Sequence, residues 1–335
     1  MKVGILTFQF ADNYGAVLQC LALQEACKKY AEQVQVVNYI PAQMVSTKYK
    51  IKKTILKTKI EKKFEQFRKN HFHKMSVKDF CDVLLVGSDQ VWNFGITGYD
   101  DFWIFPKMNY KRLCSYAASF GKNELSEKEA DYLSCHKKDY ERYFLLTVRE
   151  KSGQNFLKEM DIEAETVCDP TMLFYNNTEL YDKLAQISDC KQKEKYLLVY
   201  SLEYSETLEN LIDKVKEETG YRVLAIHPMN ACFQKCDEII EDASVYDFLA
   251  LIKNAEIVLT NSFHGLAFSY IFRKKVYCVH HSALSSRQSE LIEKSEFQCH
   301  VIADNICLID GMQKTDALDQ FIEYSEERLA AMLNV

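Results

Sequence analysis

Short apolar runs alternate with amphipathic segments along the whole chain. The run KVGILTF at 2–8 is typical of a strand buried on both faces, and a polar loop and a helical pattern over 15–30 follow it. Runs of the same kind, each entering a polar loop or a helical pattern, recur at 82–93, 111–121, 143–160, 164–173, 196–228, 244–265 and 266–297. This alternation predicts an α/β protein with parallel sheets that are covered by helices on both faces.

The elements group into two halves. We expect an N-terminal Rossmann-like domain over 1–190 that includes the basic segment described below, a C-terminal Rossmann-like domain over 191–312, and a helix over 313–335 that packs at their junction. Gly220 stands where a long helical pattern should end, and a threonine precedes the last helix in a capping position.

Composition narrows the class of protein. With 335 residues, of which 47% are hydrophobic and 13% aromatic, the chain can bury two cores, and its net charge of −6 gives no overall attraction to nucleic acid. The N-terminus has no signal-peptide apolar core, and no run of about 18 apolar residues predicts a membrane span. We expect a cytoplasmic protein whose 12 cysteines are reduced thiols. The close pair Cys232 and Cys236 lacks the partners of a metal site, so no metal is predicted.

Residues 48–74 form a basic segment. Ten lysines and one arginine stand against two glutamates, which gives a local charge of +9. Isoleucines and phenylalanines recur within it at roughly helical intervals. Two interpretations stay open: a basic helix that contacts the inner face of an anionic membrane, or a solvated face whose apolar side packs on its own domain.

Polar loops after predicted strands supply candidate ligand-binding residues, since ligands bind at the carboxyl ends of strands in open α/β sheets. No G-x-G-x-x-G or P-loop motif is present. Asp12 and Asn13 precede a helix and suit sugar hydroxyls or an anion, or else only cap that helix. Asp89 follows a buried strand and is a candidate base, and Trp92 offers a ring face to a sugar, unless they are a turn aspartate and a core tryptophan.

The segment LTNSFHGLAFSYIF at 259–272 is the strongest candidate for a site. His264 lies at a strand-to-helix junction between Ser262 and Gly265, where a titratable ring meets the amino terminus of a helix. Arg287, near the start of another helix, and Arg149, at the end of a strand, could each bind a carboxylate or phosphate in a bidentate manner. Each arginine could equally form an internal salt bridge.

Seven motifs together resemble the polysaccharide pyruvyl transferase family. In chain order they are FQFADNYGAVLQCLALQ, VGSDQVWN, SYAASFG, TVREKSG, CDPTML, TNSFHGLAFSYIF and SSRQSEL, and the resemblance covers residues 2–295. It implies a GT-B-like fold of two Rossmann-type domains, whose parallel sheets face an interdomain cleft. It also implies that domain 1–190 is the acceptor side and domain 191–312 is the donor side.

The resemblance also implies a reaction. Phosphoenolpyruvate is the expected co-substrate, without a cofactor or metal, and a glycan of capsule or cell-wall assembly, in some cases lipid-linked, is the expected acceptor. The donor-side histidine of the family corresponds to His264, and Ser262 stands where some members have an arginine. We expect His264 and Asp89 to be catalytic. The alternatives are a GT-B-type glycosyltransferase that uses a nucleotide sugar and a non-catalytic glycan-binding protein on the same fold.

Overall fold

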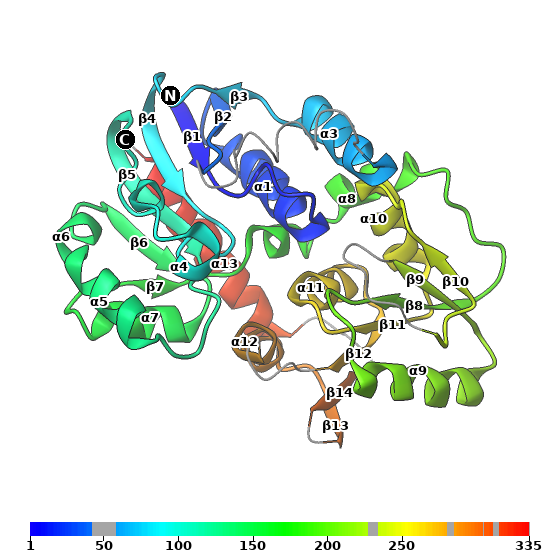
Figure 1. Cartoon of the computed structure of the whole chain (residues 1–335). Helices are drawn as coiled ribbons and strands as arrows, with labels where there is room; N and C mark the ends of the chain where they lie inside the picture. Colours follow the sequence, from blue (N-terminus) through cyan, green and yellow to red (C-terminus); the bar gives the residue numbers. More distant parts are fainter. Residues whose placement is uncertain (42–57, 227–233, 280–284, 304, 311–314, 335) are drawn as a thin grey trace. The chain divides into compact units, whose positions relative to one another are not determined.

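The computed structural model describes residues 1–41, 58–226, 234–279, 285–303, 305–310 and 315–334. The chain divides into two compact units (Figure 1). Unit 1 comprises Met1–Thr58, Glu65–Leu173 and Gln320–Val335, and unit 2 comprises Lys59–Phe64 and Phe174–Asp319.

Unit 1 contains a seven-stranded sheet in which every neighbouring pair is parallel. Its elements are β1 (Lys2–Leu6), α1 (Tyr14–Cys27), β2 (Gln33–Val37), β3 (Lys74–Met75), β4 (Phe80–Val86), α4 (Phe94–Thr97), η2 (Asp101–Trp103), β5 (Asn109–Ala118), α5 (Glu127–Cys135), α6 (Lys137–Tyr140), β6 (Leu145–Val148), α7 (Lys151–Lys158), β7 (Glu165–Thr166) and η3 (Pro170–Phe174).

The strand order of unit 1 is β3-β2-β1-β4-β5-β6-β7. The chain therefore moves outward from β1 in one direction and outward from β4 in the other. Since crossovers between parallel strands are right-handed, the helix after β1 and the helices after β5 and β6 cover opposite faces of the sheet (Figure 1). All residues of β1 and β4 are buried except Lys2, Phe80 and Asp82, as expected for the centre of a sheet covered on both sides.

Unit 2 contains a second seven-stranded sheet. Its elements are α8 (Glu179–Gln186), β8 (Tyr196–Tyr200), α9 (Glu206–Thr219), β9 (Arg222–Ile226), β10 (Glu238–Ile240), α10 (Val245–Asn254), β11 (Ile257–Thr260), α11 (Phe263–Ile271), β12 (Lys275–Val279), α12 (Ser285–Ser295), β13 (Cys299–Ala303) and β14 (Ile306–Ile309).

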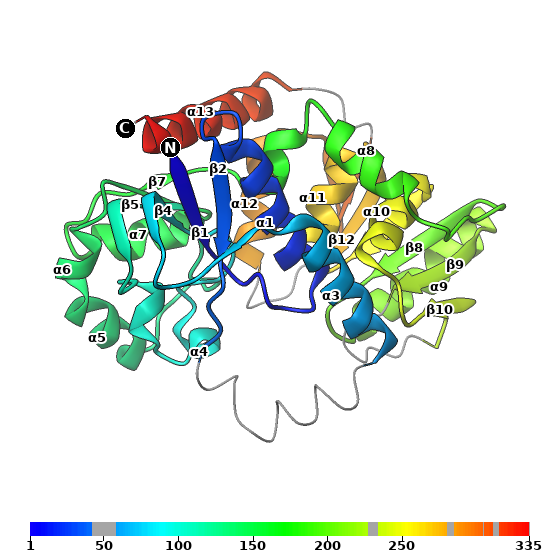
Figure 2. The same cartoon turned by 90° about the horizontal axis from the view of Figure 1, so that it is seen from above.

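The strand order of unit 2 is β10-β9-β8-β11-β12-β14-β13. Five strands are parallel, whereas β14 pairs in antiparallel fashion with both β12 and β13. Helix α9 lies on one face of the sheet, and α10 and α11 lie on the other (Figure 1). Helix α8 packs along α10 (Figure 2). The hairpin of β13 and β14 adds an antiparallel edge that the sequence pattern did not indicate.

These sheets confirm the predicted fold class of two Rossmann-like α/β units. Gly220 ends α9 in the left-handed conformation, with φ of 68°, as its position in the sequence indicated. Thr315 caps the last helix, since its Oγ1 accepts a hydrogen bond from Leu318 N at 3.3 Å. The predicted domain boundaries and the cleft between the domains stay predictions.

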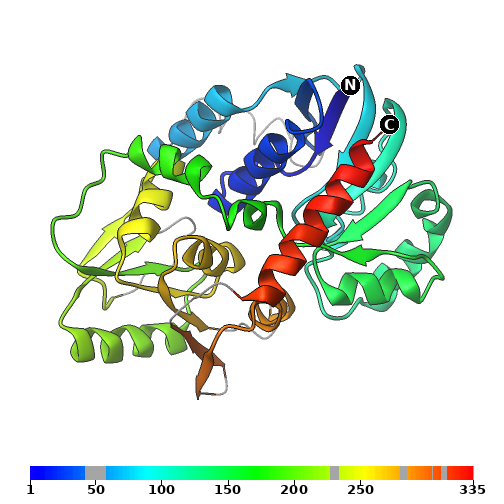
Figure 3. The ribbon, with the colours of Figure 1, turned by 180° about the vertical axis from the view of Figure 1, so that it is seen from behind.

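Two helices contain residues of both units. Helix α3 (Lys59–His71) supplies its first residues to unit 2 and the rest to unit 1, and α13 (Asp316–Leu333) begins in unit 2 and continues in unit 1 (Figure 3). Within unit 1, Ser325 of α13 accepts a hydrogen bond from Cys168 N at 2.9 Å. The last helix is thus tied to the end of the unit 1 sheet.

Residues 48–57 of the basic segment lie outside the described part of the chain. In the described part, Phe64 and Phe67 of α3 are completely buried. These two rings therefore agree with the interpretation of an apolar side packed within the protein, and membrane contact stays a prediction. No helix among the described residues is long and apolar enough to span a bilayer.

Candidate functional site

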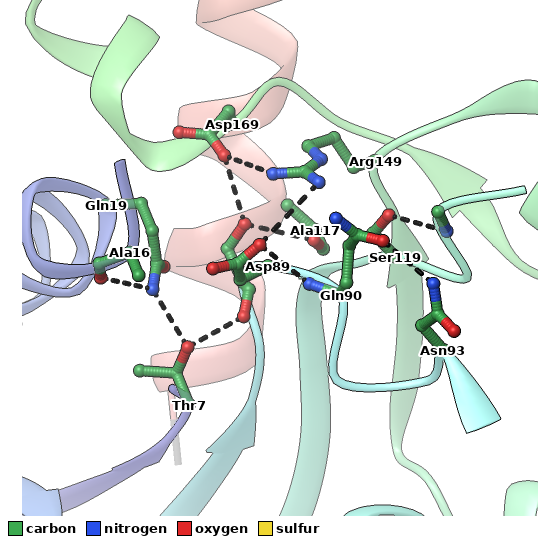
Figure 4. A network of polar contacts seen from close by, with 12 residues as sticks. Thr7, Ala16, Gln19, Asp89, Gln90, Asn93, Ala117, Ser119, Arg149 and Asp169 are labelled. Atoms are coloured by element: carbon green, nitrogen blue, oxygen red, sulfur yellow. Dashed lines mark hydrogen bonds and ion pairs between the residues drawn. The ribbon is translucent and has the colours of Figure 1, made fainter. Parts of the chain in front are cut away.

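In unit 1 the strand order reverses between β1 and β4, and open α/β sheets bind ligands outside the carboxyl ends of such strands. Hydrogen bonds join the two loops at this point. Thr7 Oγ1 donates to the carbonyl oxygen of Ser88 at 2.8 Å and accepts from Gln19 Nε2 at 2.9 Å (Figure 4). Because all three side chains are buried, they hold the loop after β1 against the loop after β4.

The backbone at the end of β4 adopts conformations that L-residues rarely take. Asp89 has φ of 76°, and Ala117 at the end of neighbouring β5 has φ of 49°. The Asp89 carbonyl oxygen accepts from Ser119 N at 2.9 Å, which ties the two unusual segments together. Left-handed non-glycine residues are costly and concentrate at functional sites. The region around Asp89 is therefore a candidate site on backbone grounds alone.

A buried arginine, Arg149, lies among three carboxylates at this site, and Figure 4 shows two of them, Asp169 and Asp89. Arg149 Nη1 donates to Asp169 Oδ2 at 2.9 Å, Arg149 Nε lies 3.8 Å from Glu150 Oε2, and Arg149 Nη2 lies 3.9 Å from Asp89 Oδ1. One positive charge thus faces three negative charges, for a formal total of −2. Burial opposes the charged form of Arg149, but the carboxylates outweigh it and raise its pKa, with Asp169 contributing most.

Two of the carboxylates are fixed by further hydrogen bonds. Glu150 Oε1 accepts from Ser119 Oγ and Phe120 N, both at 2.8 Å, which holds the loop after β5. Asp169 Oδ2 also accepts from Ser88 Oγ at 3.2 Å. Asp169 and Glu150 are therefore structural anchors that connect the ends of β4, β5 and β6.

Asp89 is the member of the cluster that solvent reaches. Its side chain is 12% exposed, whereas those of Arg149, Asp169 and Glu150 are 2%, 0% and 0% exposed. Asp89 Oδ1 accepts from the backbone N–H of Gln90 at 2.8 Å, so the carboxylate has a defined orientation. A partly exposed, oriented carboxylate can accept a proton from a bound hydroxyl group.

In unit 2 the strand order reverses between β8 and β11, and the His264 segment follows β11 at this point. Asn261 joins the two loops: its Oδ1 accepts from Leu202 N at 3.1 Å, and its Nδ2 donates to the Glu203 carbonyl oxygen at 3.4 Å. Thr260 Oγ1 donates to the carbonyl oxygen of Tyr200 at 2.6 Å. Both units thus carry their candidate residues at the reversal of strand order.

The first turn of α11 is packed closely onto the strands below it. Ser262 caps this helix, with its Oγ accepting from Gly265 N at 3.4 Å. A Cβ atom at position 265 would lie 2.2 Å from Thr260 Oγ1 and 3.0 Å from Tyr200 Cδ1, so only glycine fits. His264 is consequently held at the amino terminus of α11 with 8% of its surface exposed, and its ring meets the Phe263 ring edge-on at 5.1 Å.

Arg287 lies in the first turn of α12, which packs against α11. The residue is 8% exposed. Arg149, by contrast, lies in unit 1 and is engaged by internal carboxylates, as in the salt-bridge interpretation of its sequence context. The contacts of Arg149 therefore favour an internal salt bridge over the binding of a ligand anion.

Three other predicted residues have clear structural positions. Trp92 is completely buried, donates through Nε1 to the Trp103 carbonyl oxygen at 3.0 Å, and offers no ring face to a sugar, which corrects that interpretation. Asn13 caps α1 by accepting from Ala16 N at 3.1 Å, and Asp12 pairs with Arg68 at 2.8 Å. In the structure, Asn13 therefore acts as the N-cap of α1, which is the capping interpretation of its sequence position.

The structure also adds residues that the sequence interpretation passed over. Ser88, Glu150 and Asp169 complete the unit 1 network, and Asn261 completes the unit 2 loop pair. Each of these residues lies next to a predicted site residue or close to the end of a strand. That position in the sequence is the feature from which they could have been predicted. Among the described residues, no cluster of three or more His, Cys, Asp or Glu side chains could hold a metal ion.

The family model described as polysaccharide pyruvyl transferase matches residues 13–282. The matched range contains Asp89, Arg149, Ser262 and His264 and ends before Arg287. No curated protein matches the chain.

Several solved structures are similar to the chain as a whole. UDP-GlcNAc 2-epimerase from Neisseria meningitidis is 13% identical with a TM-score of 0.47, over 98% of this chain and 94% of that chain. The enzyme of that name from Methanocaldococcus jannaschii is 12% identical with a TM-score of 0.47, over 100% and 93%. The E. coli heptosyltransferase WaaC is 11% identical with a TM-score of 0.37, over 88% and 99%.

Proposed function

The chain belongs to the polysaccharide pyruvyl transferase family, and we propose that it transfers a pyruvyl group from phosphoenolpyruvate to two hydroxyl groups of a sugar, forming a ketal. The acceptor is a sugar of a capsular or cell-wall polysaccharide precursor. The observation that carries this assignment of roles is the different charge of the two candidate sites. One is rich in carboxylates, and the other presents a histidine at a helix amino terminus.

The unit 1 site suits a neutral acceptor. A cluster with a formal total of −2 repels phosphoenolpyruvate, which carries a phosphate and a carboxylate. A sugar hydroxyl has no charge and can donate a hydrogen bond to a carboxylate. Asp89, the partly exposed carboxylate, is the group that we assign to accept the hydroxyl proton.

The unit 2 site suits the anionic donor. His264 lies in the first turn of α11, and the positive end of the helix dipole favours a phosphate or carboxylate there. Ser262 cannot supply the positive charge that an arginine would. We therefore assign that contribution to Arg287 of the neighbouring helix α12.

The proposed reaction has three steps. His264 in its protonated form gives a proton to the methylene carbon of phosphoenolpyruvate, which leaves positive charge on the adjacent C2. One sugar hydroxyl forms a C–O bond to C2 and gives its proton to Asp89. The second hydroxyl then attacks C2, the bond from C2 to the phosphate oxygen breaks, and phosphate departs. Asp89 releases the first hydroxyl proton to solvent and His264 takes up one proton from solvent, while the second hydroxyl proton leaves with phosphate, so both side chains return to their starting forms and no redox change occurs.

An assay of released products tests this proposal. The purified protein would be incubated with phosphoenolpyruvate and a panel of methyl hexopyranosides, and phosphate release and pyruvylated glycoside would be measured. Parallel reactions would contain nucleotide sugars in place of phosphoenolpyruvate. Phosphate release coupled to formation of a glycoside ketal supports the proposal, whereas release of a nucleoside diphosphate alone would support a glycosyltransferase instead.

A further inference from the structure

Gln90 follows Asp89 at the end of β4, and its amide group is held by two neighbours. Asn93 Nδ2 donates to Gln90 Oε1 at 2.9 Å. A Cβ atom at Gly121 would lie 2.0 Å from Gln90 Oε1, so the amide occupies the space that any side chain at 121 would need. Gly121 has φ of 67°, which also favours glycine. Asn93 and Gly121 therefore hold the Gln90 amide in a defined position.

The orientation of the Gln90 amide follows from the cap of α4. Asn93 is the N-cap residue, and its Oδ1 accepts from Ile96 N at 3.3 Å. Because Asn93 Oδ1 accepts a hydrogen bond from the helix backbone, the Nδ2 group of Asn93 faces Gln90. Nδ2 is a donor, so the atom of Gln90 that meets it is the acceptor Oε1. The Gln90 Nε2 group, with two N–H donors, consequently points away from Asn93 and lies on the Asp89 side (Figure 4).

We propose that Gln90 determines which acceptor sugars bind. Its Nε2 group donates a hydrogen bond to one sugar oxygen, and the neighbouring oxygen of the sugar belongs to the hydroxyl group whose proton Asp89 accepts. This inference rests on the proposed function. Gln90 is half-buried and the Asp89 side chain is 12% exposed, so solvent reaches both side chains. An acceptor on Asp89 and a donor on the next residue in the chain, Gln90, match a pair of neighbouring oxygens on a sugar ring. A site that hydrogen-bonds an oxygen discriminates against analogues that lack it.

The test uses three variants of the whole chain. Gln90→Ala removes the donor. Asn93→Asp keeps an acceptor for the cap of α4 but replaces the Nδ2 donor with a carboxylate oxygen, so Gln90 should turn and donate to that carboxylate instead of the sugar. Gln186→Ala, at the exposed end of α8, is the matched control. If Gln90→Ala fails to fold, Gln90→Met gives the same test, because methionine has a side chain of similar length and no hydrogen-bond donor.

Binding of methyl galactoside, glucoside and mannoside and of their monodeoxy analogues would be titrated by ligand-observed NMR. For the wild type we expect one deoxy position to weaken binding about three- to tenfold, as for one lost hydrogen bond. Gln90→Ala and Asn93→Asp should weaken binding of the parent glycoside and remove the discrimination at that position. Their affinity for phosphoenolpyruvate should not change, and Gln186→Ala should bind all of these ligands as the wild type does. Equal glycoside affinity and discrimination in wild type and Gln90→Ala, or no glycoside binding at all, would overturn the proposal.

The two proposals fail in different ways. A wild type that forms the ketal but shows no dependence on Gln90 overturns the role of Gln90 alone. A wild type that binds glycosides through Gln90 but releases no phosphate from phosphoenolpyruvate overturns the proposed function alone.

Discussion

Arg149 donates a hydrogen bond to Asp169 over 2.9 Å, and both side chains are almost completely buried at the end of the unit 1 sheet. Arg149 directly follows β6 and Asp169 lies in the segment after β7, and Asp169 also holds Ser88 of the loop that carries Asp89. The pair therefore positions the candidate base without facing the substrate itself.

Arg149→Met should lower the free energy of unfolding by roughly 3–5 kcal/mol, because it leaves buried carboxylates without their cation. Urea unfolding measures this change. The double variant Arg149→Met with Asp169→Asn should recover part of the loss, since fewer buried charges remain uncompensated. Additive losses in the double variant would show that the pair is not coupled.

Gly265→Ala should destabilise unit 2 by about 1–3 kcal/mol and reduce transfer, because the added Cβ meets Thr260 Oγ1 at 2.2 Å and displaces the first turn of α11. Thermal unfolding and the ketal assay measure the two effects. The matched control is Gly95→Ala, where the added atom lies 3.4 Å from its nearest neighbour, Asn93 Oδ1. We expect the control to unfold close to the wild type.

His264→Gln should reduce ketal formation by about 10²–10⁴-fold, the usual contribution of a general acid. Glutamine keeps a polar side chain of similar length at the start of α11 but cannot give up a proton in this way. Single-turnover kinetics with phosphoenolpyruvate measure the chemical step. Turnover at the wild-type rate would remove His264 from the mechanism.

Arg287→Lys should weaken phosphoenolpyruvate binding, because an ammonium group does not reproduce the planar, bidentate contacts of a guanidinium. Isothermal titration with phosphoenolpyruvate measures the affinity. Glycoside binding serves as the internal control and should not change. An unaltered phosphoenolpyruvate affinity would assign Arg287 a structural role.

Stability should fall as the pH drops below about 6.5, in part through His71 of α3. Burial lowers the pKa of His71 below its ordinary value of 6.5, with Lys28 acting in the same direction and Glu25 opposing it. The unfolded chain then binds a proton more readily than the folded chain, so acid favours unfolding. Urea unfolding at pH 8 and pH 5.5 should show a smaller difference for His71→Gln, whereas the exposed His73→Gln should behave as the wild type.

Much of the fold follows from local sequence. Apolar runs such as KVGILTF and the helical patterns after them correspond to β1, α1 and their later counterparts. The end of α9 at Gly220 and the cap at Thr315 were also predictable, because backbone preference and capping depend on a few adjacent residues. Short or edge elements such as β3, β10 and the hairpin of β13 and β14 were not, since so few residues carry a weak pattern.

The sequence by itself determined that His264 and Asp89 follow buried strands, and that polar residues gather at those strand ends. Only the tertiary structure decided that β1 lies beside β4 and β8 beside β11, because strand order depends on hydrogen bonds between segments far apart in the chain. It likewise decided that Trp92 is in the core and that Arg149 is neutralised internally. The burial of a side chain depends on its neighbours from other elements, and the pattern around that residue does not contain them.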